Sequence, residues 1–520
     1  MDDKVIVTNR SALVAKYGTA GAKKIQSAVD ALVASDKSRG ISTRLIYLDD
    51  AAAMKRGGGK RVADASDPRQ NKEAVDAIFK STNPAYLMLL GAIDVIPHQD
   101  LTNPLFKPPD DTDQYAFGDL PYACDAPYSR DIASFRGPTR VVGRLPDLTG
   151  AKQPTHLLSV LSISAKYKSR PAAAYGAFFG LSAYAWRKST SLSLENVFGS
   201  STALKLSPPS GPSHPAGQLA ALAHFINCHG GDSDPSFYGQ KGSSYPKSLT
   251  SQSVNGKIRS GTVATAECCF GAQLYDSVTL NLPPPICQQY LAQGAYGYFG
   301  SSTIAYGPAT GNGSADLITQ YFLAAVLEGA SLGRAALTAR QKFVQQAAEL
   351  DPADLKTLAQ FSLLGDPSIH PLVSSEATEV PKGMAKSDAA RQQRQERRVK
   401  AKALGDFLHD TKPTASKKAP RRRRSAAVEK TLRSIARQAG IGRRRDFTAY
   451  VVRRPPGARR LSGKQISGAS HYFVAVYRKS LDGYAVAAVA KEVDGRIVGY
   501  RIYEEKMCSV RSASRGSPAA

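Results

Sequence analysis

The sequence predicts an α/β fold for residues 1–373, with a mostly parallel sheet flanked by helices, followed by a small β-rich domain. In the first part, short apolar strands alternate with helical segments, and several strands are unbroken apolar runs. Such runs are typical of parallel strands that are buried on both faces. The composition then changes near residue 373, which separates the second part. A chain of 520 residues is long enough for two or three domains.

The elements of the first part follow one another in a regular order. We expect strands at 5–8, 43–48, 86–91, 141–146, 222–228, 262–267 and 295–300. Apolar residues recur at helical spacing at 23–33, 71–79, 156–168 and within 315–348. Residues 101–137, which are rich in Pro, Asp and Tyr, are expected to form a long surface loop. This alternation favours a layered α/β architecture.

The net charge of +26 is concentrated in the C-terminal part of the chain. Residues 374–520 carry 34 Lys and Arg against 13 Asp and Glu, a net charge of +21, whereas residues 1–373 carry +5. We expect 374–446 to be a basic, partly disordered linker or arm. Its basic residues, with those up to position 464, make 382–464 a candidate for binding nucleic acid or an acidic protein. A solvated linker explains the same charge equally well.

The last part of the chain, 447–520, is predicted to be a small β-rich domain of unknown role. Its polarity alternates from residue to residue, and Asp-Gly pairs mark turns between the strands. The strands are expected at 447–454, 471–479, 484–493 and 496–503.

The N-terminus and the cysteines lead to an expectation about the compartment. The chain begins Met1-Asp2-Asp3-Lys4, without the basic start of a signal peptide, and no apolar run is long enough to span a bilayer. Six cysteines in 520 residues give no disulfide framework. We therefore expect a cytoplasmic protein with reduced thiols and no membrane partner.

The chemistry is expected at the ends of two strands. The strand at 222–228 runs into His229, and the strand at 262–267 runs into Cys268 and Cys269. Open parallel sheets bind ligands at the carboxyl ends of their strands. The interval between the two strands is long enough for a crossover connection, which takes ~30 residues. The strands are therefore expected to be neighbours, with the imidazole beside a thiol.

A histidine beside a cysteine fits nucleophilic catalysis. The thiol becomes a good nucleophile when a neighbouring histidine takes its proton, and the same histidine can protonate a leaving amine. The amides of Gly230 and Cys269 are candidates for stabilising the oxyanion. Cys269 is the expected nucleophile and Cys268 the alternative, because successive strand residues face opposite sides. Asn227 and Asp232 could orient His229, or they could be turn residues.

The sequence raises two other kinds of site, a zinc site and an acidic substrate pocket. A zinc site would need paired ligands, such as two cysteines spaced by two residues, and the adjacent cysteines with one histidine do not match it, so no metal is expected. Asp113 and Asp119, with Asp110 and Asp111, could line a substrate pocket for Arg or Lys, although a solvated acidic loop explains them as well.

Five segments together resemble the gingipain family of caspase-like cysteine peptidases. They are the His-Gly motif at 229–230, Glu-Cys-Cys-Phe-Gly at 267–271, Tyr-Leu-Met-Leu-Leu-Gly-Ala-Ile-Asp-Val-Ile-Pro at 86–97, Val-Gly-Arg-Leu-Pro at 142–146 and Phe-Ser-Leu-Leu-Gly-Asp-Pro-Ser at 361–368. The resemblance implies a caspase-like layered fold over residues 1–373, with His229 and Cys269 as catalytic residues. It also implies a cysteine endopeptidase that acts on protein or peptide substrates without a cofactor. The alternative is an inactive peptidase-fold scaffold whose basic tail binds nucleic acid or an acidic partner.

Overall fold

The structure is a computed structural model, and its described residues fall into two compact units. The first unit is Met1–Glu379 with Arg459–Lys464, and the second is Val380–Ala458 with Gln465–Ala520. The residues that the structure describes are 2–346, 350–373, 417–418, 426–438, 447–453, 469–479, 484–493 and 496–506.

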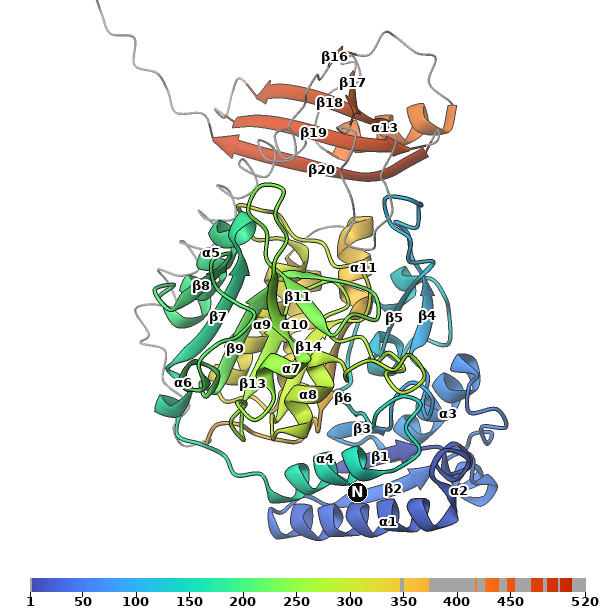
Figure 1. The fold of residues 1–520 in the computed structure, drawn as a ribbon. Helices are drawn as coiled ribbons and strands as arrows, with labels where there is room; N and C mark the ends of the chain where they lie inside the picture. Colours follow the sequence, from blue (N-terminus) through green and yellow to red (C-terminus); the bar gives the residue numbers. More distant parts are fainter. Residues whose placement is uncertain are drawn as a thin grey trace, which may run out of the picture. The chain divides into compact units, whose positions relative to one another are not determined.

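A ten-stranded sheet forms the centre of the first unit (Figure 1). Its strands are β1 (Lys4–Thr8), β2 (Thr43–Tyr47), β3 (Tyr86–Leu90), β6 (Val142–Leu145), β7 (Phe178–Ala183), β8 (Leu204–Ser207), β9 (Ala223–Asn227), β13 (Val263–Ala266), β14 (Gly297–Ser301) and β15 (Phe361–Gly365). Their order in space is β2, β1, β3, β6, β15, β14, β13, β9, β7, β8. Neighbours are parallel from β2 to β6 and from β14 to β8, and β15 is antiparallel to β14. The predicted mostly parallel sheet is confirmed.

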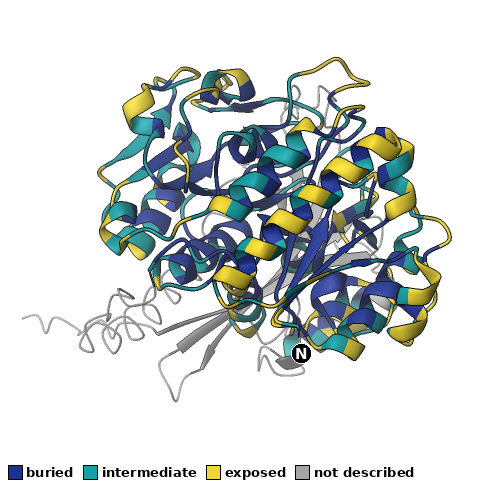
Figure 2. Ribbon diagram, turned by 90° about the horizontal axis from the view of Figure 1, so that it is seen from below, coloured by how far each residue is buried: buried dark blue, intermediate teal, exposed yellow. Residues whose placement is uncertain are grey.

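Helices cover both faces of this sheet, with exposed outer sides over buried strands (Figure 2). Successive residues of β14 identify the two faces, because they point to opposite sides of the sheet. The ring of Tyr298 lies 5.4 Å from Tyr290, and the ring of Phe299 stacks at 4.5 Å on Phe322. On the face of Tyr298, Tyr290 belongs to α8 (Ile286–Ala292), which contacts α4 (Thr155–Lys166), and α4 packs on α1 (Arg10–Ser38). On the face of Phe299, Phe322 belongs to α9 (Ser314–Leu327), which contacts α5 (Arg187–Phe198) and α10 (Leu332–Gln345). The remaining helices are α2 (Ala51–Arg56), α3 (Pro68–Thr82), α6 (Ala216–Leu219), α7 (Ser251–Val254) and α11 (Pro352–Gln360).

The segment 101–137 differs from the single surface loop that the sequence predicts. It contributes to a hairpin of β4 (Gln99–Thr102) and β5 (Tyr115–Gly118), followed by the 3-10 helices η1 (Leu120–Ala123) and η2 (Ile132–Phe135). The apolar side chains of Leu101, Tyr122 and Phe135 are buried. The prediction was wrong because the many prolines and aspartates concealed these widely spaced core residues.

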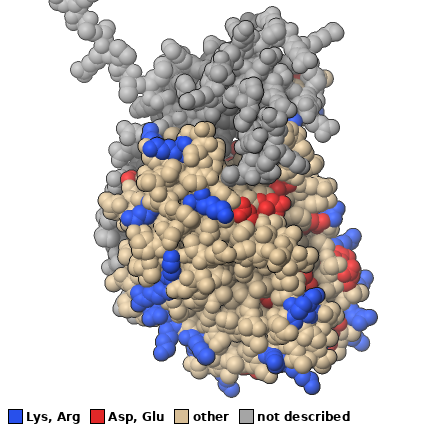
Figure 3. Space-filling model, in the orientation of Figure 1, with Lys and Arg blue, Asp and Glu red and all other residues tan. Residues whose placement is uncertain are grey.

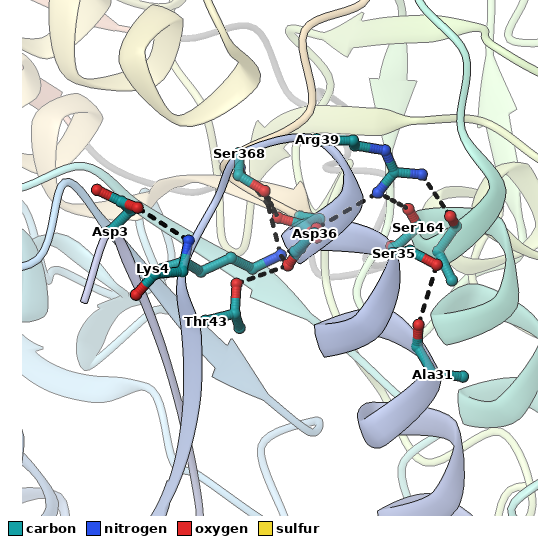
Figure 4. Close-up of polar contacts among 12 residues, drawn as sticks. Asp3, Lys4, Ala31, Ser35, Asp36, Arg39, Thr43, Ser164 and Ser368 are labelled. Atoms are coloured by element: carbon teal, nitrogen blue, oxygen red, sulfur yellow. Dashed lines mark hydrogen bonds and ion pairs between the residues drawn. The ribbon is translucent and has the colours of Figure 1, made fainter.

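A buried ion-pair network joins the first strand, β1, to the segment that follows β15 (Figure 4). The Lys4 ammonium has no exposed surface and donates to Asp36 at 3.0 Å, to Asp366, and to Ser368 at 3.1 Å. Asp366 and Ser368 belong to the Gly-Asp-Pro-Ser segment. A buried charge is costly without a partner. Asp366 and Ser368 therefore stabilise the buried Lys4 of β1, so we assign this segment a structural role rather than a catalytic one.

A second buried ion pair involves Arg144 of the Val-Gly-Arg-Leu-Pro segment. Its guanidinium is fully buried and holds both carboxylate oxygens of Asp119, at 2.9 and 2.6 Å. It also donates to the carbonyls of Gly91 and Ile96, at 3.0 and 2.7 Å. Arg144 thus joins the segments at 142–146 and 86–97, and the segment at 361–368 contributes Asp366 and Ser368 to the separate network around Lys4.

The second unit contains a five-stranded antiparallel sheet. Its strands, in spatial order, are β16 (Lys417–Lys418), β17 (Thr448–Arg453), β18 (Ala469–Lys479), β19 (Tyr484–Val493) and β20 (Arg496–Lys506). The helix α13 (Ala426–Gln438) contacts β19 and β20, with Val428, Leu432 and Ile435 buried on one helical stripe. The β-rich pattern of this part is confirmed. The rest of the basic segment 382–464 lies outside the described residues, so its binding partner stays a prediction.

The surface of the first unit carries its charges in a scattered way. On the face drawn in Figure 3, Lys and Arg side chains are spread over the unit rather than gathered in a continuous patch, as expected for a segment with a net charge of only +5. Within the described ranges, none of the helices is long and apolar enough to cross a membrane.

Candidate active site

The two strands that precede His229 and Cys269 lie side by side. β9 and β13 are parallel neighbours, with Ile226 opposite Ala266, and the amide of Glu267 donates to the Ile226 carbonyl at 2.9 Å. The chain therefore leaves the sheet at adjacent points toward His229 and toward Cys269. The predicted pairing of these two strands is confirmed.

The segments that follow the two strands touch at Gly230. A Cβ atom on Gly230 would lie 1.8 Å from the carbonyl oxygen of Cys269, far inside any permitted contact. Only glycine can therefore occupy this position without moving the backbone of Cys269. The close approach explains the His-Gly pair, since the residue after the histidine must lack a side chain.

The turn after Cys269 is held against the end of β14. Phe270 has a φ of 56°, in the left-handed region that non-glycine residues seldom adopt. Its amide donates to the carbonyl of Thr303 at 2.9 Å, and the Ala272 amide donates to Ser301 at 2.7 Å. These bonds hold a strained turn immediately after the cysteine, as is common where a reactive side chain must be presented.

The two adjacent cysteines differ in exposure. Cys268 is fully buried, whereas Cys269 is partly exposed. Among the five cysteines in the part of the chain that the structure describes, Cys269 alone is not buried. Its Sγ lies 3.6 Å from the carbonyl oxygen of Ala305, in the loop after β14. A peptide carbonyl can therefore reach Cys269 more easily than Cys268.

His229 begins a short strand, β10 (His229–Gly230), which pairs with β11 (Ser236–Tyr238) and, through it, with β12 (Lys247–Thr250). Its ring lies 4.1 Å from the ring of Trp186, in the 3-10 helix η4 (Tyr184–Trp186), and 5.3 Å from the ring of Tyr245. Its Nε2 is 2.8 Å from Oε1 of Gln240. No sequence pattern indicates a role for Gln240, because its contact with His229 depends on how the chain folds after β11.

Both reactive groups are neutral at physiological pH. Burial lowers the pKa of His229 to about 4, although the hydrogen bond with Gln240 raises it somewhat. Burial likewise raises the pKa of Cys269 above its ordinary value, and the Lys356 charge offsets this in part. Burial favours the uncharged form of each group, so the resting site holds a thiol and an imidazole rather than an ion pair.

The acidic residues considered for a substrate pocket are already paired. Asp119 gives both oxygens to Arg144, which lies deep in the core, so it has no oxygen left for a substrate cation. Asp113 accepts from Lys356 and from the Ile304 amide, at 2.7 and 2.8 Å, and Asp111 accepts from the same Lys356 at 2.7 Å. The burial of Asp119 and its ion pair with Arg144 argue against a role in a substrate pocket. Asp113 lies near the site, but its charge is shared with a buried lysine.

The residues that flank His229 contact other groups. The side-chain amide of Asn227 donates from Nδ2 to the hydroxyl of Ser189 at 3.4 Å. Asp232 accepts from Gln273 at 2.7 Å, and the Ser233 amide donates to the same glutamine at 2.8 Å. Asp232 thus links the segment after His229 to the segment after Cys269, instead of orienting the imidazole directly.

A pair of buried carboxyl groups lies behind the turn. Glu267 hydrogen-bonds to Asp316, accepts from Thr319 at 3.0 Å, and is buried. Burial, and then the neighbouring Asp316 charge, raise the pKa of Glu267 well above its usual value, and burial raises the pKa of Asp316 to about 7. The pair therefore shares a proton at neutral pH. Among the described residues, no group of three or more His, Cys, Asp or Glu side chains is placed to hold a metal ion.

Comparisons with known proteins bear on the segment that carries this site. Residues 222–372 match the model of a family described as Peptidase family C25, and this range includes both His229 and Cys269. The predicted resemblance to gingipain-type peptidases is confirmed over these residues, and it supports a peptidase function. A search of curated proteins gave no match.

Solved structures give two more distant likenesses. A structure described as a protease is 13% identical, with 97% of each chain covered and a TM-score of 0.45. The Saccharomyces cerevisiae separase–securin complex is 11% identical, with 45% of this chain and 14% of the other covered and a TM-score of 0.25.

Proposed function

We propose that the first unit is a cysteine endopeptidase that cleaves protein or peptide substrates with Cys269 as nucleophile and His229 as general base and acid. The observation that carries the proposal is the contact of the two strand ends, where Gly230 packs directly on the Cys269 carbonyl. This contact joins a partly exposed thiol to the segment that bears the histidine.

The reaction would follow from two neutral groups. His229 takes the thiol proton as Sγ of Cys269 attacks the peptide carbonyl, so a C–S bond forms and the carbonyl oxygen becomes an oxyanion. The amides of Gly230 and Cys269 are the proposed donors to this oxyanion. The C–N bond then breaks as His229 gives the proton to the leaving amine. A water molecule, deprotonated by His229, hydrolyses the thioester and restores the thiol.

The test compares cleavage of a peptide library by the purified full chain and by single variants. Cys269→Ala and His229→Ala should each lower kcat/KM by at least about a thousand-fold, because the first variant lacks the nucleophile and the second lacks the general base and acid. Cys268→Ala should leave most of the activity, since its thiol is buried. Cys287→Ala, at a buried cysteine outside the site, controls for the loss of a thiol.

Two results would overturn the proposal. Activity that survives Cys269→Ala but is lost in Cys268→Ala would move the nucleophile to the neighbouring residue. Absence of cleavage by the natural chain, together with no labelling of Cys269 by a peptidyl chloromethyl ketone, would favour the inactive scaffold.

A further inference from the structure

The Gln240 side chain is fixed in one orientation beside His229. Its Nε2 donates to the Tyr245 hydroxyl at 2.9 Å and to the Gly242 carbonyl at 3.4 Å. Reversing the amide would turn its oxygen toward the Gly242 carbonyl oxygen, leaving two acceptors face to face. The oxygen of the amide therefore faces the imidazole, as the 2.8 Å contact requires.

This orientation determines which imidazole nitrogen carries the proton. An amide oxygen can only accept, so Nε2 of His229 must be the donor. In a neutral imidazole the other nitrogen, Nδ1, then has the free lone pair. A base for the Cys269 thiol needs such a lone pair, and a neutral ring offers it on one nitrogen only.

The backbone of Gln240 is anchored to the rigid sheet. Its amide donates to the Ser207 carbonyl at 3.0 Å, and its carbonyl accepts from the Ala185 amide at 2.9 Å. Ser207 ends β8, and Ala185 lies just after β7. A Cβ on Gly239 would come within 2.3 Å of the Ser207 oxygen, so the approach is close as well as hydrogen-bonded. Gln240 is thus held from two strand ends, which suits a residue that must position another.

The partner is also uncharged, so burial determines the charge state of the ring and keeps it neutral. The titratable groups on the segments packed against His229 include Tyr245, Cys269 and Tyr238. Tyr238 pairs with His229 across β10 and β11, and its hydroxyl donates to Asp234 at 2.8 Å. The nearby charged side chains are directed elsewhere. Arg187 and Lys241 lie over the ring of Tyr184, at 4.2 and 4.9 Å, and Asp232 binds Gln273. A carboxylate in place of the amide would favour imidazolium and remove the basic lone pair over a wider pH range.

We propose that Gln240 is a positioning residue that holds His229 as the Nε2–H tautomer and so leaves Nδ1 as the base for Cys269. The inference rests on the proposed function. Gln240 acts through His229, and Tyr245 acts one step further back by fixing the amide.

Three variants test this role in the full chain. Gln240→Leu should lower kcat about 10- to 100-fold with little change in KM, the usual range when an outer partner of a histidine is lost. Gln240→Glu keeps the acceptor but adds a negative charge, so the acid limb of the kcat/KM profile should move to higher pH. Tyr245→Phe should reduce kcat less than Gln240→Leu. Gln252→Leu, at an exposed glutamine, is the matched control.

A direct readout of the tautomer does not depend on activity. In ¹⁵N-labelled protein at neutral pH, the His229 ring should carry its proton on Nε2, and Gln240→Leu should give a mixture of tautomers. A proton on Nδ1 in the natural chain would overturn the inference, even if the leucine variant failed to fold.

The two proposals fail in different ways. If Cys269→Ala abolishes cleavage while Gln240→Leu keeps the natural kcat and Gln240→Glu keeps the natural pH profile, the positioning role is wrong and the peptidase stands. If Cys269→Ala still cleaves, the peptidase mechanism is wrong, and the inference falls with it.

Discussion

The two halves of the central sheet provide different partners for some of their buried titratable groups. On the side of β1 and β6, Lys4 and Arg144 are fully buried as charges and are met by carboxylates. On the side of β9 and β13, His224 and Cys228 are buried without an oppositely charged partner and are neutral. Burial lowers the pKa of His224 to about 4 and raises the pKa of Cys228 to about 12.

The difference lies in the partners and not in the degree of burial. Asp119 is buried, which by itself would raise the pKa of its carboxyl, yet the charge and hydrogen bonds of Arg144 lower that pKa below its usual value. His224 is equally buried, but its partners are the Tyr290 hydroxyl and the Ala221 carbonyl, both at 3.0 Å and both uncharged. Opposite charge keeps a buried group ionised, and its absence leaves the group neutral. The proposed catalytic pair lies in the neutral half.

Removing one charge from the ionic half should give the largest effect. Arg144→Met leaves Asp119 buried without its cation and frees two carbonyls, so the free energy of unfolding should fall by about 3–5 kcal/mol. Urea unfolding, followed through the fluorescence of Trp186, measures this change. Arg136→Met, at an exposed arginine, should change stability by less than about 0.5 kcal/mol.

A second replacement sharpens the same comparison. Arg144→Met combined with Asp119→Leu should recover part of the lost stability, because the unpaired carboxylate is gone. A loss below about 1 kcal/mol in the single variant, or no recovery in the double variant, would mean that the ion pair is not what stabilises this half.

Much of the fold was predictable because its main signals are local. The apolar runs of β3 and β9 and the helical spacing in α9 are read directly from neighbouring residues. The edge strand β8 and its neighbour β7 were not predicted, since small and polar residues such as Gly180, Ser182 and Lys205 interrupt them. Their place in the sheet depends on pairing with β9, which no local pattern contains.

The candidate site was predictable only in part, for the same reason. His229 and Cys269 follow apolar strands, so their positions could be read from the sequence. The pairing of Asp119 with Arg144 was not predicted, because the two residues lie 25 positions apart in the sequence and are buried. Gln240 was missed because its contact with His229 depends on how the chain folds back after β11 and on the bonds to Ser207 and Ala185. The spacing of residues along the sequence does not indicate contacts that form only in the tertiary structure.

The reactivity of Cys269 should follow from its place in the neutral half. A thiol whose pKa lies above its usual value and an imidazole with a pKa of about 4 form no stable ion pair near pH 7. Its alkylation by iodoacetamide should therefore rise about 100-fold between pH 7 and pH 9, following the thiolate fraction. Mass spectrometry of the labelled peptide measures the rate, and Cys269→Ser identifies the site.

The pH dependence of the alkylation rate of Cys269 distinguishes a neutral thiol from a thiolate–imidazolium pair. A thiolate–imidazolium pair, resembling the ion pairs of the other half, would give a plateau of high reactivity between about pH 5 and pH 8. Such a plateau in the natural chain would contradict the neutral resting state. In Gln240→Glu, the added charge should increase the rate in this interval.

The smallest expected effect concerns Glu267, next to the cysteines. Its pKa is raised well above the usual value by burial and then by Asp316, so the folded chain keeps its proton at neutral pH while the unfolded chain loses it. Folding then takes up a proton, and stability falls as pH rises above the unfolded pKa, by up to about 1.4 kcal/mol per pH unit. Glu267→Gln removes this dependence, because the amide can still donate to Asp316 and accept from Thr319. The variant should gain about 1 kcal/mol over the natural chain between pH 6 and pH 7, measured by urea unfolding at both values. Glu195→Gln, at an exposed glutamate, should show no such gain, and an equal difference at the two pH values for Glu267→Gln would mean that Glu267 is already ionised in the folded chain.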